Sequence, residues 1–101
     1  MDLEQVKAML DTTQYPVAYG CFEEPQEMPY ICYRAAYSNN FGADNIVYQP
    51  INHIQIELYT KLKDPEAEDK VETALSSLFW EKTEEYIDTE KCYQIDYEIE
   101  V

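Results

Sequence analysis

The stretch Ile54–Tyr59 reads IQIELY, and its apolar residues alternate strictly with polar ones. This two-residue period is typical of a strand that buries one face. The same period returns from Cys92 to Val101, where the sequence is CYQIDYEIEV. Between these two segments the apolar period lengthens to that of a helix. We therefore expect a strand, a helix and a second strand that share one core.

The intervening helix is expected to run from Pro65 to about Trp80. Its apolar residues recur at helical spacing and draw a single stripe: Ala67, Val71, Ala74, Leu75, Leu78 and Phe79. Asp64 suits the N-cap, and Pro65 suits the first helical position, where no N–H donor is needed. The expected core contains residues from all three elements: Ile54, Ile56, Leu58, Val71, Leu75, Leu78, Ile95, Tyr97 and Ile99.

The rest of the chain adds a helix and further strands around this unit. Helical spacing of apolar residues predicts a helix within residues 2–11, with Asp2 as its cap. Strand-like segments are residues 17–22, 30–37, 46–60 and part of 81–87. Pro50 lies within the third of these, which indicates a sheet edge or a bulge. Residues 1–101 are therefore expected to form a single α+β domain, with a mainly antiparallel sheet of four to five strands and two helices packed on it.

The balance of charge limits the partners of this protein. The chain has 21 acidic and 7 basic residues, which gives a net charge of −14. Binding to a phosphate backbone requires clustered Lys and Arg, so we expect neither direct nucleic-acid binding nor attraction to anionic membranes. A basic protein surface would be attracted instead.

Three cysteines, Cys21, Cys32 and Cys92, lack CxxC spacing, and we expect them to be reduced thiols. The N-terminal residues are acidic and no apolar run approaches 18 residues, so neither a signal peptide nor a membrane span is expected. These features favour a protein that folds in a cytoplasm.

No set of residues indicates catalysis or a cofactor. His53 is the only histidine, and a lone strand histidine is usually structural. Acidic pairs such as Glu23–Glu24 and Glu84–Glu85 arise readily in so acidic a chain, so a solvated acidic face is their default interpretation. The acids around Asp64 lack the spacing of a calcium loop. We expect no enzyme activity, no cofactor and no metal.

Residues 38–45 read SNNFGADN and are rich in turn formers, which predicts an eight-residue hairpin tip. An aromatic residue on such a tip favours contact with a partner, although Phe41 could instead fold back onto its own strands. The predicted protein interface consists of Asn39, Asn40, Phe41, Gly42, Asp44, Asn45 and Tyr48.

Several segments of residues 30–101 together resemble one family of phage proteins. The segments are FGADN (41–45), IQIELYT (54–60), KDPEAE (63–68), YIDTE (86–90) and CYQIDYE (92–98). With them the chain resembles the tail terminators, also called tail-completion or head-to-tail joining proteins, of long-tailed bacteriophages (siphoviruses) and prophages.

The resemblance implies a small structural protein with no catalytic residues. It implies a homo-oligomeric ring, commonly a hexamer, that caps the tail tube, stops tail growth and joins the tail to the head connector. The implied partners are the chain itself, the tail-tube protein and the head-completion protein. The implied location is the host cytoplasm during assembly and then the head-proximal end of the virion tail.

A second class of function competes with this one. A small acidic phage protein can mimic DNA and block a host DNA-binding protein by placing carboxylates where phosphates would lie. Acidic residues on all faces favour the terminator, whereas a one-sided row favours the mimic. A small enzyme, the third class, has no motif to support it.

Overall fold

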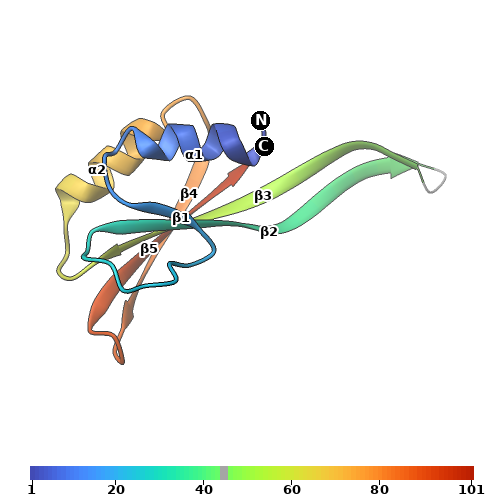
Figure 1. Cartoon of the computed structure of the whole chain (residues 1–101). Coiled ribbons are helices and arrows are strands. Elements are labelled where there is room, and N and C mark those ends of the chain that lie inside the picture. The colour runs from blue at the N-terminus through green and yellow to red at the C-terminus, as the bar shows by residue number, and fades with distance from the viewer. Residues whose placement is uncertain (44–45) are drawn as a thin grey trace.

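The computed structural model describes the backbone of residues 1–43 and 46–101 and the side chains of residues 1–36 and 52–101. The described residues form two helices and five strands (Figure 1). They are α1 (Leu3–Asp11), β1 (Val17–Tyr19), β2 (Tyr30–Ala43), β3 (Ile46–Thr60), α2 (Pro65–Ala74), β4 (Trp80–Ile87) and β5 (Cys92–Glu100).

The five strands form one mixed, mostly antiparallel sheet in the order β1-β2-β3-β5-β4. Only the short strand β1 runs parallel to its neighbour, β2. Both helices lie on the same side of the sheet (Figure 1). The predicted fold class, an α+β domain with a mainly antiparallel sheet and two helices, is confirmed.

Both helices begin where the sequence predicts. The N–H of Gln5 donates to Asp2 Oδ1 (2.8 Å) and the Gln5 side chain accepts from the Asp2 N–H (2.8 Å), which makes a reciprocal cap for α1. For α2, Asp64 accepts from the N–H of Ala67 (3.1 Å), as its predicted N-cap role requires.

The predicted end of α2 near Trp80 was wrong, because the helix ends at Ala74. The chain then turns, with the N–H of Leu78 donating to the Leu75 carbonyl (2.9 Å), and Trp80 enters β4 opposite Ile99. Leu75 and Leu78 still face the core from this turn. Leu75 and Leu78 continue the helical spacing of apolar residues although they are not helical, and this spacing made the predicted helix too long.

The first strand is shorter than predicted, because β1 ends at Tyr19 and not at Phe22. Gly20 follows with a φ of +77°, a conformation that glycine adopts without steric cost. Its N–H donates to the Tyr33 carbonyl (2.8 Å), which is a last bond to β2 before the chain leaves the sheet.

The predicted eight-residue hairpin tip was also wrong. Strand β2 continues to Ala43 and β3 begins at Ile46, with Ser38 opposite Asn52 and Ala43 opposite Ile46. Turn-forming residues thus pair in a ladder, and a register shift between Phe41 and Gly42 accommodates the irregularity. Asp44 and Asn45 lie outside the described residues.

Pro50 lies at a sheet edge, as predicted. It pairs with Asn40 of β2, while the hydrogen bonds between β3 and the β5 side end at Asn52, which exchanges two bonds with Val101 (3.1 and 2.9 Å). Residues two apart in a strand direct their N–H groups to the same side. The nitrogen of Pro50 therefore faces the same side of β3 as β5 does, but β5 does not extend as far as Pro50. The missing N–H consequently leaves no neighbouring strand without a hydrogen bond.

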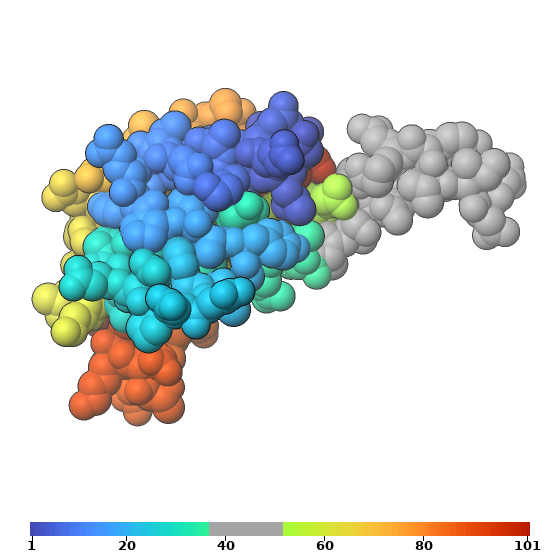
Figure 2. All heavy atoms as spheres, in the orientation of Figure 1, coloured from blue at the N-terminus to red at the C-terminus, as the bar shows by residue number. Residues whose placement is uncertain are grey.

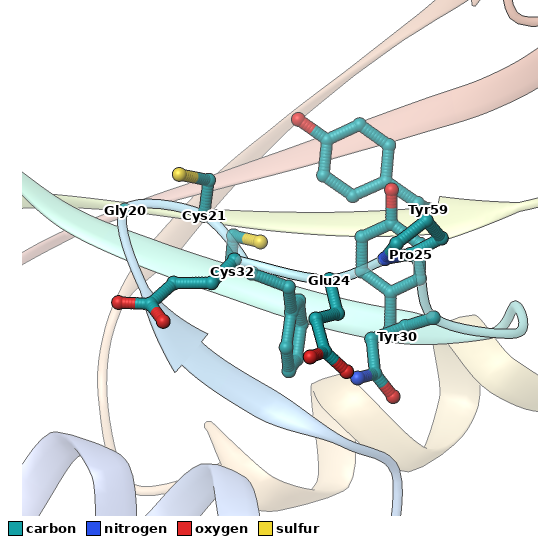
Figure 3. A pocket seen from close by; sticks show the side chains of 10 residues that line it. Gly20, Cys21, Glu24, Pro25, Tyr30, Cys32 and Tyr59 are labelled. Atoms are coloured by element: carbon teal, nitrogen blue, oxygen red, sulfur yellow. The ribbon is translucent and has the colours of Figure 1, made fainter.

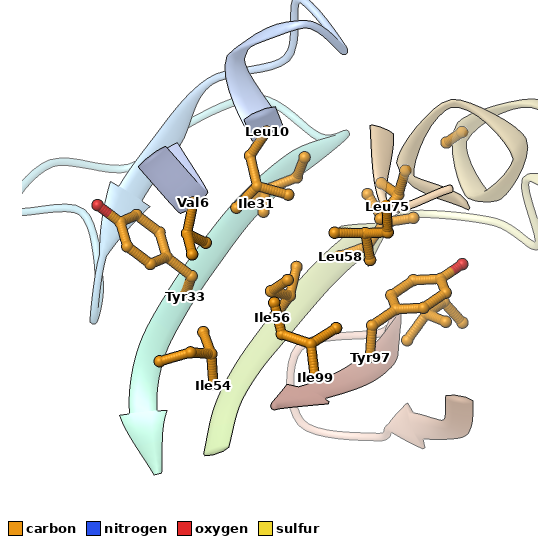
Figure 4. Close-up of a cluster of buried hydrophobic side chains, with 13 residues drawn as sticks. Val6, Leu10, Ile31, Tyr33, Ile54, Ile56, Leu58, Leu75, Tyr97 and Ile99 are labelled. Carbon is orange, nitrogen blue, oxygen red and sulfur yellow. The ribbon is translucent and has the colours of Figure 1, made fainter. Parts of the chain in front are cut away.

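The core lies between the helices and one face of β2, β3 and β5 (Figure 4). Of the nine residues predicted to form it, eight are buried, and Leu78 is partly buried against them. The structure adds residues from the N-terminal half and from α2: Val6, Leu10, Ile31, Tyr33 and Ala67.

Leu75→Ala should lower the free energy of unfolding by about 2–5 kcal/mol, because the side chain has no exposed surface and its loss leaves a cavity. Equilibrium denaturation in urea measures the change. The matched variant Leu78→Ala, at a partly buried position, should cost less. A loss of under about 0.5 kcal/mol for Leu75→Ala would remove this residue from the core.

Candidate functional site

The sheet has one face covered by helices and one that bears polar side chains. Because strand residues alternate between faces, Ile54, Ile56 and Leu58 point toward the helices, and the residues between them point to the opposite face. The sequence predicted this division for β3 and β5.

The register of the strands gathers carboxylates into rows on that opposite face. Glu57 of β3 lies beside Asp96 of β5, and Glu98 of β5 lies beside Glu81 of β4. A further row places His53 beside Glu100. Among the described strand side chains of this face, Arg34 is the permanent cation.

Glu57 and Asp96 are the most buried carboxylates in these rows. Glu57 is only 8% exposed and accepts from the Tyr59 hydroxyl (2.9 Å) and from Gln55 Nε2 (2.9 Å). Burial raises the pKa of Asp96, and the neighbouring charge of Glu57 raises it further against the lowering effect of the Gln94 hydrogen bond. This face therefore holds like charges that disfavour each other.

His53 is fixed between strands rather than presented to solvent. Its side chain is 5% exposed, Nδ1 lies 2.9 Å from Glu98 Oε1, and Nε2 lies 3.6 Å from Glu100 Oε1. This position fits the structural role predicted for the histidine. In the part of the chain that the structure describes, no group of three His, Cys, Asp or Glu side chains is arranged to hold a metal ion.

On the helix side, ion pairs join α2 to β4 and to the segment before α2. Glu68 is 4% exposed and lies 2.7 Å from Lys63 Nζ and 2.8 Å from Lys82 Nζ. Burial alone would raise the pKa of Glu68, but the two lysines outweigh it and lower the pKa. Glu72 also pairs with Lys82 (2.9 Å) and accepts from the Tyr97 hydroxyl (2.8 Å). The carboxylates of Glu68 and Glu72 therefore link α2 to β4 and to Lys63.

A hollow of about 380 Å³ lies beneath the loop that follows β1 (Figure 3). Tyr30 stacks on Tyr59 there (4.9 Å between ring centroids), and Phe22 meets Tyr30 edge-on (5.4 Å). Burial, the charge of Glu57 and the nearby Cys21 raise the pKa of Cys32 to about 11. A thiol with so high a pKa is protonated at neutral pH and is a poor nucleophile. Cys32 is therefore not activated for nucleophilic attack.

All three cysteines are free thiols, as predicted. Cys32 and Cys92 are buried and Cys21 is exposed. The acidic pairs Glu23–Glu24 and Glu84–Glu85 are solvent-exposed.

Five of the seven predicted interface residues lie in the far part of the β2–β3 hairpin. Asn39, Asn40, Phe41 and Gly42 are on β2 and Tyr48 is on β3, whereas Asp44 and Asn45 lie outside the described residues. The side chains of residues 37–51 are likewise outside the description. The backbone pairing shows that this part of β2 and β3 pairs as two strands alone, because β1 ends opposite Tyr33 and β5 pairs only from His53 onward.

Comparisons with protein-family models and with curated proteins find no match to this chain. Neither of the described helices is long and apolar enough to cross a membrane.

Asp96→Asn should stabilise the protein at neutral pH, by at most about 1 kcal/mol. The pKa of Asp96 is raised in the folded state, so ionisation of this carboxyl costs stability above that pKa. Asparagine removes the cost and keeps an oxygen that can accept from Gln94. Denaturation at a series of pH values measures the effect.

The gain should vanish below the ordinary aspartate pKa of about 3.9, where the carboxyl is protonated in both states. Glu81→Gln, at an exposed position on the same face, is the control for a general loss of charge. An equal gain from both substitutions would show that burial of Asp96 is not the cause.

Proposed function

We propose that the protein is a tail terminator of a long-tailed bacteriophage or prophage. In this role copies of the chain form a ring, commonly a hexamer, on the last ring of tail-tube subunits. The ring stops growth of the tube and offers its other side to the head-completion protein. The protein acts without a cofactor and catalyses no reaction.

The observation that carries the proposal is the β2–β3 hairpin beyond the rest of the sheet. Residues 37–51 contain a single charged residue, Asp44, in a chain that is 28% charged. Both outer edges of the described hairpin strands leave backbone N–H and C=O groups without a neighbouring strand of this sheet. A hairpin with so little charge and with open edges is suited to pair with another protein chain.

The edge strand β4 differs from this hairpin in a way that supports the proposal. Four of its eight residues are charged, Glu81, Lys82, Glu84 and Glu85, and all four are exposed. Charged side chains on an edge strand discourage pairing with a further strand. The chain therefore protects one edge of the sheet and leaves the hairpin open.

The acidic rows of the polar sheet face also fit this role. DNA passes through the head-proximal end of a tail during ejection, and a channel lined with carboxylates repels its phosphates. We infer that this face is turned to the channel of the ring, so that the DNA does not adhere to it.

The same acidic rows give the second candidate, a DNA mimic, its one supporting observation. However, exposed carboxylates are also found on α2, at Glu66 and Asp69, and in the connector at Glu23 and Glu24. Acids on several faces favour the terminator over a one-sided mimic. Binding of the protein to a purified host nuclease or repressor, with loss of DNA binding, would favour the mimic instead.

Shortening the hairpin should abolish capping and leave the fold intact. Replacing residues 40–50 by Asn-Gly joins Asn39 to Ile51, which already pair, through a turn that hairpins prefer. The core lies outside this segment, so the melting temperature should change by only a few degrees, about 4 °C or less. Tail tubes assembled with this variant should grow to uncontrolled length in electron micrographs.

The control is the wild-type protein, which should give tubes of fixed length and a ring mass in native mass spectrometry. If the shortened variant folds, forms rings and still yields tails of normal length, the hairpin is only a connector. If the wild-type protein neither forms rings nor binds tail tubes, the proposed function is wrong.

A further inference from the structure

We propose that Leu62 and Lys61 of one copy dock into a groove at the N-terminal end of α1 on a second copy. The contact rests on the proposed function and deepens it, because it names the surfaces through which neighbouring subunits of the ring would meet.

The groove lies where the helix layer ends and the sheet continues. Its volume is about 660 Å³. Five apolar and two acidic residues account for most of its lining: Met1, Leu3, Ala35, Ile54, Val101, Asp2 and Glu4. In Figure 2 this region lies between the dark-blue N-terminal residues of α1 and the yellow-green residues of β3. Met1 (53% exposed) and Leu3 (38% exposed) leave apolar surface open to a partner.

The groove also carries an available negative charge. The carboxylate of Asp2 is engaged in capping α1, but Glu4 is exposed and has no ion pair among the described side chains. A partner that enters this groove should therefore combine an apolar side chain with a positive charge.

The loop between β3 and α2 has this combination. Leu62 is 76% exposed and stands between Lys61 and Lys63, in a chain with only seven basic residues. Lys63 is engaged by Glu68 and Glu84, whereas Lys61 is exposed and has no ion pair in the described part of the chain. The apolar stem of Lys61 can lie along the groove while its ammonium group approaches Glu4.

Leu62 fits the groove better than the other strongly exposed apolar side chain. Phe79 is 83% exposed, but it shares a surface hollow with Glu81, Glu98 and Glu100. Bringing that hollow against Asp2 and Glu4 would place carboxylates against carboxylates, which costs free energy. The lysines beside Leu62 would instead attract the carboxylates of Asp2 and Glu4.

The two surfaces lie at separate places along β3. Ile54 lines the groove, and Leu62 follows the end of the strand at Thr60, so that at about 3.3 Å per residue they are roughly 25 Å apart. A copy cannot fill its own groove with its own Leu62. Such a head-to-tail contact between copies generates a closed ring when the rotation per subunit allows closure.

The test compares self-association of the full-length protein and its variants by analytical ultracentrifugation. Leu62→Asp should raise the dissociation constant by about 30-fold or more, since it places a carboxylate against an apolar, acidic groove. Lys61→Glu and Glu4→Lys should each raise it by about five-fold, and the double variant should recover most of that loss. Phe79→Asp, a change of the same kind at another exposed position, should leave the dissociation constant unchanged.

A photo-crosslinking residue, p-benzoylphenylalanine, at position 62 provides an independent measurement. Mass spectrometry should find it joined to residues 1–4 of another copy. Rings that form equally well with Leu62→Asp, or crosslinks that lead elsewhere, overturn this contact but leave the proposed ring standing. A wild-type protein that never forms rings or caps tubes overturns the proposed function. In that case the contact is tested by the crosslink from position 62 to residues 1–4, measured in a concentrated solution of the protein.

Discussion

The burial of one face of β3 is the constraint on which the rest of the fold depends. This strand pairs with β2 on one side and β5 on the other, and its residues Ile54, Ile56 and Leu58 have at most 1% of their surface exposed. A register slip by one residue would turn Glu57 toward the helices and these apolar residues outward. The two pairings and the helix layer are therefore specified together.

The same alternation divides the electrostatics of the protein. On the helix side the carboxylate of Glu68 is buried and lies between two lysines, so its charge helps to hold α2 on the sheet. On the opposite face Glu57 and Asp96 lie side by side, and one permanent cation is near them, Arg34, whose Nε lies 3.7 Å from Glu57 Oε2. Charge thus stabilises the fold on the helix side, and repulsion between carboxylates mildly destabilises it on the opposite face. Such a cost in stability is more readily explained by function than by folding.

The sequence predicted the features that follow from local chemistry. Both helix caps, the alternating strands around Ile56 and Tyr97, and most of the core were recognised, because caps and apolar periods are local signals. The end of α2 was missed because the apolar spacing persists through the turn after Ala74. The length of the hairpin was missed because turn-forming residues such as Asn39 pair in a ladder when a long partner strand is present. Strand pairing at long range has no equivalent signal in a single sequence.

The candidate site was predictable only in part, for the same reason. The segment that contains Phe41 was identified from composition, but its place in an open-edged pair of strands required the register of β2 against β3. The groove beside Leu3 was not predicted, because it joins α1 to residues that are distant in sequence, such as Ile54 and Val101. A leucine between two lysines is visible in the sequence, but only the fold shows that Leu62 is exposed rather than buried.

Net charge finally limits how copies of this chain can assemble. Each copy carries a net charge of −14, so two copies brought together at random repel each other. Contact is favourable only where at least one of the two surfaces that meet is neutral or positive. The uncharged strands of the hairpin are one such surface, and the loop from Lys61 to Lys63 is another. An acidic protein in which every contact includes one of these segments would assemble in one geometry and resist non-specific aggregation, which is what a ring that must stop at a fixed number of subunits requires.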